Sequence, residues 1–192
     1  MSKLILASAS PRRRALLSQL GTPFIVLPAD IDEQYHAGEA PRDYVIRMSR
    51  TKAQQVAWQY PDAWVLGADT IVTIDDRILG KPKDAAEAAA MLSTLSGRVH
   101  AVMTGLALVR QEQGYIALET VSTRVFFRSL SEADISAYIA TEEPFDKAGA
   151  YAIQGRAGVF VQRYEGCYTN VVGLPVQRTA AMLQCAGFDS GT

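Results

Sequence analysis

The chain has little cysteine and no long apolar run, and each shortage excludes a class of protein. Its 192 residues include only two cysteines, Cys167 and Cys185, which do not resemble a disulfide framework or a zinc site. No apolar stretch approaches the roughly 18 to 20 residues that span a bilayer. The stretch LILA after Lys3 is too short for a signal-peptide core. We therefore expect a soluble protein from a reducing compartment.

An excess of charge of either sign is also lacking. The 19 basic and 20 acidic residues give a formal charge of −1, which argues against a broad surface for nucleic acid or an anionic membrane. Any basic site must therefore be local. His36 and His100 are the two histidines, and neither lies in a motif for a Ser–His–Asp or Cys–His nucleophile. The GxxxxGK[ST] phosphate loop and the GxGxxG fingerprint are missing as well.

What is present is an interleaved pattern of helices and strands. Apolar residues make up 48% of the chain, enough for a packed core. Several neighbouring strands are linked too tightly to be parallel, so residues 1–192 predict a single α/β domain with a mixed sheet. Asp84 and Glu87 predict a capping box for one helix. Strands are expected at 3–7, from 24, and at 63–74, 75–82, 99–109 and 115–130, helices at 11–20, 41–60, 85–95, 132–140 and after 175, and a hairpin at 159–172.

The segment SASPRRRALL combines a helix start with three arginines. Ser10 is expected to cap the helix and Pro11 to occupy its first position. Cations are disfavoured at a helix N-terminus, so these arginines need a negative partner. Arg13 lies three, four and seven residues before three leucines, which places it on the inward face. Its partner is either an interior carboxylate or a phosphate held with the backbone N–H groups of the turn.

Two lysines extend this set of cations. Lys52 falls within the apolar stripe of the helix at 41–60, where it either snorkels at the edge or projects its ammonium into a cleft. Lys81 lies between Gly80 and Pro82, where the chain turns sharply after a strand. By itself Lys81 is typical of a surface lysine.

The acidic candidates are more informative. Asp69 interrupts the apolar run VLGADTIV, and Gly67 before it leaves room for something to approach the backbone. A buried Asp69 is either a structural, hydrogen-bonded carboxylate, a metal ligand or a general base. Asp30, Asp32 and Glu33 offer further carboxylates for a hard cation, which also takes phosphate oxygens. These residues alone predict a phosphoanion-binding hydrolase that uses metal-assisted attack by water.

Six segments in order resemble the Maf family of nucleoside triphosphate pyrophosphatases: LASASPRRRALLSQLG, VLGADTIV, GKP, LSGRVH, DKAGAYAIQG and NVVGLP. The resemblance implies an ITPase-like α/β fold, with a long mixed, twisted sheet flanked by helices and two lobes around a deep cleft. It also implies hydrolysis between the α- and β-phosphates, giving a nucleoside monophosphate and pyrophosphate. The implied cofactor is a divalent cation, Mg²⁺, Mn²⁺ or Co²⁺. Members are cytoplasmic and often homodimeric.

The resemblance also assigns roles to residues. Asp69 is similar to the family's proton acceptor, and Glu33 resembles a carboxylate that holds the metal together with Asp69. Four residues resemble the triphosphate clamp: Ser8, Arg13, Lys52 and Lys81. Three positions that sort substrates in the family are Arg12, Thr70 and Gln154. This combination is similar to the subfamily that acts on dTTP and UTP, and Asp146 and Lys147 belong to the loop on the base side.

Two alternatives to a dTTP/UTP pyrophosphatase stay open from the sequence. The family name reflects a link to cell-division arrest, so one alternative is a nucleotide-binding regulator with little turnover. A regulator needs the phosphate clamp but no water-activating base, and Asp69 therefore favours the enzyme. The other alternative shares the chemistry but acts on modified pyrimidine nucleotides.

Overall fold

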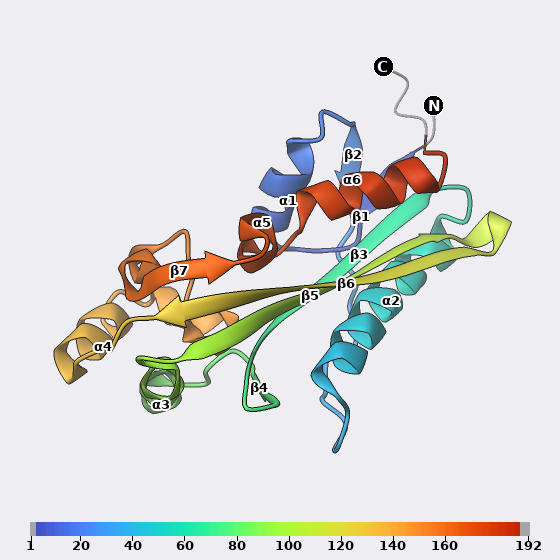
Figure 1. Cartoon of the computed structure of the whole chain (residues 1–192). Coiled ribbons are helices and arrows are strands. Elements are labelled where there is room, and N and C mark those ends of the chain that lie inside the picture. Colours follow the sequence, from blue (N-terminus) through green and yellow to red (C-terminus); the bar gives the residue numbers. More distant parts are fainter. Residues whose placement is uncertain (1–2, 189–192) are drawn as a thin grey trace. The chain divides into compact units, whose positions relative to one another are not determined.

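The computed structural model describes residues 3–188 and contains one mixed sheet with helices (Figure 1). The strands are β1 Leu4–Leu6, β2 Phe24–Val26, β3 Trp64–Ile74, β4 Arg77–Leu79, β5 Val99–Arg110, β6 Tyr115–Phe127 and β7 Val161–Glu165. The α-helices are α1 Pro11–Ser18, α2 Pro41–Gln59, α3 Ala85–Leu95, α4 Glu132–Ile139, α5 Tyr168–Val172 and α6 Val176–Cys185. Short 3-10 helices are η1 Gln111–Gln113, η2 Glu143–Asp146, η3 Ala148–Ala150 and η4 Arg156–Phe160.

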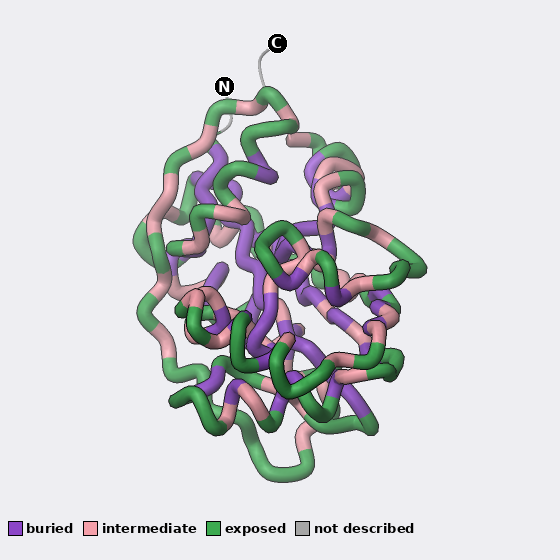
Figure 2. Tube along the Cα trace, turned by 90° about the vertical axis from the view of Figure 1, so that its left-hand side faces the viewer, coloured by how far each residue is buried: buried purple, intermediate pink, exposed green. Residues whose placement is uncertain are grey.

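The sheet confirms the predicted mixed α/β architecture. Its strands follow the order β2-β1-β3-β5-β6-β7, and β4 pairs with β3 beside this path. β1 is parallel to both β2 and β3, whereas β4 is antiparallel to β3 and β7 is antiparallel to β6. The parallel strands are buried at β1 and along most of β3, and the buried positions of the chain can be followed in Figure 2.

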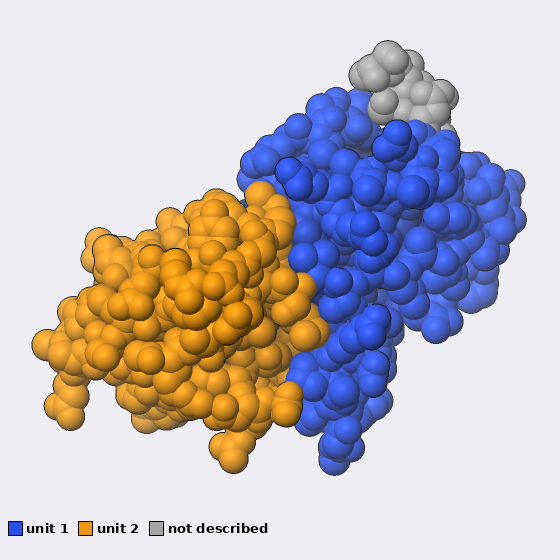
Figure 3. Space-filling model, in the orientation of Figure 1, with its two compact units in different colours: residues 1–69, 104–121, 173–192 blue, residues 70–103, 122–172 orange. Residues whose placement is uncertain are grey.

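Two compact units make up the chain (Figure 3). Unit 1 comprises residues 1–69, 104–121 and 173–192, and unit 2 comprises residues 70–103 and 122–172. Unit 1 has a core cluster that includes Ile5, Ala53 and Val65. Unit 2 has its own cluster, built around α3, α4 and the buried aromatics of β6 and η4. The deep cleft implied by the resemblance stays a prediction.

Helix α2 approaches the sheet at two glycines of unit 1. A Cβ placed on Gly67 of β3 would lie 2.2 Å from Ser49 O, and one on Gly105 of β5 would lie 2.2 Å from Val45 O. Both positions therefore exclude any side chain, because the α2 backbone already occupies that space. The room that the sequence predicted beside Gly67 is filled by this helix.

The predicted hairpin at 159–172 is half wrong. β7 pairs with β6, but after Gly166 the chain forms α5 in place of a return strand. The hydroxyl of Thr123 on β6 accepts from Cys167 N and donates to Cys167 O, both at 3.1 Å. The fully buried Asn170 donates to Val102 O at 2.9 Å and to Thr123 Oγ1 at 3.0 Å. These tertiary hydrogen bonds override the strand propensity of the segment.

The predicted capping box at α3 forms in part. Asp84 Oδ1 accepts from Glu87 N at 2.8 Å, as expected for the N-cap. The Glu87 carboxylate, however, accepts from Lys83 N at 2.7 Å and not from the backbone of Asp84. Asp84 itself has an extended backbone, with φ −154° and ψ 178°, as is usual for an N-cap residue.

His100 on β5 is buried in unit 2 and supports the loop that follows η3. Its Nε2 lies 2.7 Å from Tyr151 Oη, and its ring contacts Phe127 edge-on, with centroids 4.8 Å apart. Nδ1 has no partner among residues 3–188. Burial lowers the pKa of His100 from 6.5 to about 4. The folded protein therefore holds a neutral imidazole.

This neutral His100 should make folding pH-dependent. As the pH falls below 6.5, the unfolded chain binds the proton first, because the folded-state pKa is about 4. The stabilisation is complete above pH 6.5, and up to about 3 kcal/mol of unfolding free energy is lost between pH 6.5 and 4. Urea unfolding across this range should show His100→Gln losing less stability than the wild type. A pH-independent difference between the two proteins would contradict this origin.

Candidate active site

The turn before α1 fixes Arg13. Ser10 Oγ accepts from Arg13 N at 3.4 Å and Pro11 opens the helix, so the predicted cap is confirmed. Arg13 Nη1 donates to Ser8 Oγ at 3.2 Å, and Arg13 Nε donates to Gly173 O at 2.9 Å. Ser8 lies five residues from Arg13 in the sequence, and Gly173 lies 160 residues away. Together the two contacts set the plane of the guanidinium and confirm that Arg13 faces inward.

The electrostatic neighbours of Arg13 are the carboxylates that the sequence singled out. Burial lowers the pKa of Arg13, the charge of Asp69 raises it, the charge of Arg12 lowers it and the charge of Glu33 raises it. Arg13 therefore lies near both carboxylates and near Arg12, which is itself half-buried. An arginine remains charged under these conditions.

Lys52, Asp69 and Glu33 form the centre of the site in unit 1. Lys52 Nζ lies 2.7 Å from Asp69 Oδ1 and 2.6 Å from Glu33 Oε1. The side chains of Lys52 and Asp69 are 10% and 12% exposed, whereas that of Glu33 is 51% exposed. Lys52 thus lies inside the protein and does not snorkel at its edge. One ammonium joins a buried carboxylate to one that faces solvent.

The approach of α2 to β3 explains this contact. Gly67 and Asp69 lie two residues apart on β3 and so share a face of the sheet. Ser49 and Lys52 lie three residues apart on α2 and share a face of the helix. Because Ser49 O packs directly on Gly67, Lys52 is carried to Asp69. Gly67 has no reactive side chain, yet its close contact with α2 sets the positions of Lys52 and Asp69.

Tyr44 and Arg47 hold the loop of Glu33, and neither residue was predicted from the sequence. Tyr44 Oη donates to Glu33 O at 2.9 Å, and Arg47 Nη2 donates to Gln34 O at 3.0 Å. Burial, followed by the charges of Asp69 and Glu33, raises the pKa of Tyr44 to about 12, so the phenol remains a donor. The sequence does contain one signal for them. Tyr44 and Arg47 are three residues apart on one helix and therefore share a face, which lies against the loop.

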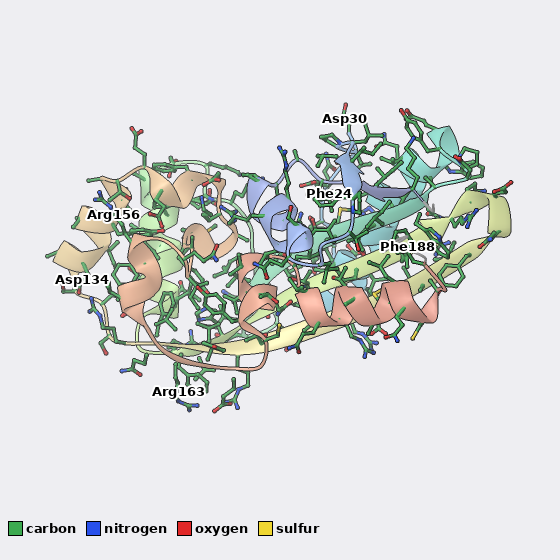
Figure 4. All side chains as sticks on the ribbon, turned by 90° about the horizontal axis from the view of Figure 1, so that it is seen from above. Phe24, Asp30, Asp134, Arg156, Arg163 and Phe188 are labelled. Carbon is green, nitrogen blue, oxygen red and sulfur yellow. The ribbon has the colours of Figure 1, made fainter. Side chains whose placement is uncertain are left out.

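The other acidic candidates of this loop have local roles. Asp32 Oδ1 accepts from Gln34 N at 3.0 Å and so closes a turn. Asp30 is exposed, and its side chain points away from the ribbon in Figure 4. Its backbone oxygen accepts from Gln55 Nε2 of α2 at 2.6 Å. Of these three candidate carboxylates, Glu33 is the one that contacts Lys52.

Unit 2 carries a second set of predicted residues on its loops: Lys81, Asp146, Lys147 and Gln154. Gly149 N donates to Gly80 O at 2.9 Å, which ties the loop of Asp146 and Lys147 to the turn of Lys81. Lys147 forms an ion pair with Asp146. Lys81 and Gln154 are exposed, and Thr70, which follows Asp69 directly in β3, is half-buried. The structure thus groups the predicted residues into one set in each unit.

The carboxylates of unit 1 suit a hard cation that substrate helps to hold. Residues 3–188 contain no group of three or more His, Cys, Asp or Glu that could bind a metal ion by themselves. Glu33 and Asp69 nevertheless converge on one point, the Lys52 ammonium. Mg²⁺ is commonly held by one or two carboxylates together with substrate phosphates, so this pair fits such an ion.

Comparisons with known proteins address the family of the chain. A family model described as "Maf-like protein" matches residues 3–186. A dTTP/UTP pyrophosphatase of Myxococcus xanthus is 55% identical over 184 residues, covering 96% of this chain and 92% of the relative. A dTTP/UTP pyrophosphatase of Pelotomaculum thermopropionicum is 49% identical over 189 residues, covering 98% and 99%.

A solved structure supports the architecture. The Staphylococcus aureus Ham1 protein has a TM-score of 0.51 at 12% identity, covering 96% of this chain and 100% of that one. This similarity concerns the fold alone and confirms the predicted ITPase-like α/β architecture. Within residues 3–188, the helices are too short or too polar to cross a bilayer. Because the family model spans nearly the whole chain and relatives share about half of its residues, the chain belongs to the Maf family.

Proposed function

We propose that the protein hydrolyses the bond between the α- and β-phosphates of dTTP and UTP, giving the nucleoside monophosphate and pyrophosphate. One observation carries the proposal: Arg13 and Lys52 lie with the carboxylates Asp69 and Glu33 in one cluster of unit 1. Cations of this kind bind phosphate oxygens, and a neighbouring carboxylate can take a proton from water. The activity named for the relatives from Myxococcus and Pelotomaculum supports it.

The cations have distinct tasks in this proposal. Arg13, held by Ser8 and by the Gly173 carbonyl, presents a preset guanidinium to phosphate oxygens. Lys52 adds a second charge, and Lys81 on its exposed turn adds a third. Because a triphosphate carries several negative charges, it provides the partner that the arginines beside the α1 N-terminus require.

Asp69 is the proposed proton acceptor for the attacking water. Oδ1 accepts from Lys52, so we assign the proton transfer to Oδ2 of the same carboxylate. A resident divalent cation, held by Glu33 and Asp69 with substrate phosphates, would stabilise the charge that develops on the phosphoryl oxygens. The rigid strand β3 fixes the base, and α2 fixes Lys52 beside it.

We assign base selection to Arg12, Thr70 and Gln154, and the family resemblance adds Asp146 and Lys147 as residues of the base-side loop. A glutamine amide offers both a donor and an acceptor, which suits the edge of uracil or thymine. Modified pyrimidines with the same edge fit this proposal. The family resemblance also supports a cytoplasmic homodimer, and the balanced charge supports a small-molecule substrate over nucleic acid.

A nucleotide panel tests this function. Purified protein with Mg²⁺ or Mn²⁺ should convert dTTP and UTP to monophosphate and pyrophosphate, and should act more slowly on CTP and on purine nucleotides. Chromatography of the nucleotides with a pyrophosphate assay distinguishes the products. Release of inorganic phosphate with a diphosphate would refute the assigned bond. Tight UTP binding without product after long incubation would instead indicate a regulator with little turnover.

A further inference from the structure

The turn that presents Gln154 has a defined geometry. Gly155 N donates to Ala152 O at 3.0 Å, so residues 152–155 form a four-residue turn. Gln154 occupies its third position and is exposed. The Cα–Cβ bond of a residue at the tip of a turn follows the backbone of that turn. Whatever fixes this turn therefore fixes the place from which the Gln154 side chain extends.

A carboxylate from η2 fixes the turn. Glu143 Oε2 accepts from Arg156 N at 3.1 Å, directly after the turn. Glu143 Oε1 accepts from Tyr138 Oη of α4 at 3.0 Å. The two oxygens of one half-buried carboxylate thus connect helix α4 to the end of the Gln154 turn. Hydrogen bonds to an ionised group are stronger than neutral ones.

The glycine of the turn makes this contact possible. A Cβ on Gly155 would lie 1.8 Å from Glu143 Oε1 and 2.5 Å from Glu143 Cδ. The φ of Gly155 is −100°, which any residue can adopt, so the backbone itself does not require glycine here. The absent side chain at 155 makes room for the carboxylate.

Two neighbours complete the arrangement. Burial raises the pKa of Tyr138, and its hydrogen bond to Glu143 raises it further, so the phenol stays protonated and donates. Lys147 Nζ donates to the backbone oxygen of Glu143 at 3.5 Å. Glu143 therefore touches both parts of the proposed base side, Lys147 through its main chain and the Gln154 turn through its side chain.

We propose that Glu143 is a positioning residue for base selection, which it performs by holding the turn that carries Gln154 in one place. The inference rests on the proposed function and deepens it. Uracil and thymine present an acceptor at O4, whereas cytosine presents a donor at N4. A turn that shifts lets the Gln154 amide reach either base with its donor or its acceptor. A turn held in place limits the positions from which the amide reaches the base, and so favours one of them.

Four variants test this role: Glu143→Ala, Glu143→Gln, Gly155→Ala and the double variant Glu143→Ala/Gly155→Ala. The matched control is Glu142→Ala, an exposed neighbour of the same charge. The readout is the ratio of kcat/KM for UTP to that for CTP, with KM and kcat reported separately. The same ratio is measured as binding affinity by calorimetry in an Asp69→Asn background, so the inference is tested even if turnover is absent.

Glu143→Ala should lower the UTP/CTP ratio about tenfold, as expected for one lost hydrogen-bond preference, through KM more than kcat. Gly155→Ala should reproduce this loss, because its Cβ displaces the carboxylate, and the double variant should lose no more than either single one. Glu143→Gln and Glu142→Ala should keep the ratio within about threefold.

An unchanged ratio in both folded Glu143→Ala and folded Gly155→Ala would overturn the inference, and so would additive losses in the double variant. If Glu143→Ala does not fold, Gly155→Ala with Glu143 retained decides the question. Absence of pyrophosphate release from the wild type refutes the proposed function instead. In that case the calorimetric ratio still decides whether Glu143 orients Gln154.

Discussion

Asp69→Asn should lower the rate of pyrophosphate release from UTP by about 10²- to 10⁴-fold, the usual contribution of a general base. The substitution is nearly isosteric, and the amide oxygen can still accept from Lys52, whose Nζ lies 2.7 Å from Asp69 Oδ1. An amide cannot take the proton from water, so chemistry should fail while the cluster stays assembled. The measurement is single-turnover kinetics together with calorimetric binding of UTP.

The matched control for Asp69→Asn is Asp76→Asn. Asp76 is exposed in the turn between β3 and β4, and its φ of 58° is one that asparagine tolerates well. Both variants lose one negative charge, so a general electrostatic effect would appear in both. Turnover within a few-fold of the wild type in Asp69→Asn would remove Asp69 from the role of base.

Lys52→Met should lower the free energy of unfolding at pH 7 by about 3 kcal/mol and also abolish most turnover. Methionine keeps the apolar stem but leaves the buried Asp69 without the ammonium that lies 2.7 Å away. Glu33, at 51% exposure, can return to water, so Asp69 accounts for most of the expected loss. Urea unfolding measures the effect, with the exposed Lys83→Met as control.

The double variant Lys52→Met/Asp69→Asn separates stability from catalysis. Because the buried charge is gone with its partner, the double variant should unfold at a free energy closer to the wild type than Lys52→Met alone. Its turnover should stay low, since both the phosphate ligand and the base are missing. If the two stability losses simply add, the ion pair is not the reason for either.

Local sequence signals were sufficient for the elements that depend on neighbouring residues. Ser10 and Pro11 predict the start of α1, and the spacing of Arg13 from its leucines predicts its inward face. The contact of Lys52 with Asp69 could not be predicted in this way, because it depends on where α2 packs against Gly67. The strand pattern drew attention to Gly67, but it did not indicate that α2 packs against this glycine.

The errors have the same physical origin. The segment after Gly166 has the composition of a strand. Its Asn170 and Cys167, however, donate hydrogen bonds to Val102 of β5 and Thr123 of β6, and the segment forms a short helix. Glu143 lies in a segment of ordinary composition, so the sequence does not single it out. Its proposed role depends on the close approach of its carboxylate to Gly155. Long-range hydrogen bonds and close backbone approaches leave no periodic trace in a sequence.

The close approach at Gly67 affects how tolerance to substitution should be interpreted in this protein. Every residue other than glycine would place its Cβ 2.2 Å from Ser49 O. Position 67 therefore tolerates no substitution, although it has no side chain that could bind a phosphate. Asp69, two residues later, is restricted for a different reason. Variation among natural or selected sequences would make the two positions look equally invariant. Measuring both the amount of folded protein and its specific activity separates the two cases. A substitution at Gly67 should lower the amount of folded protein, whereas one at Asp69 should lower the specific activity.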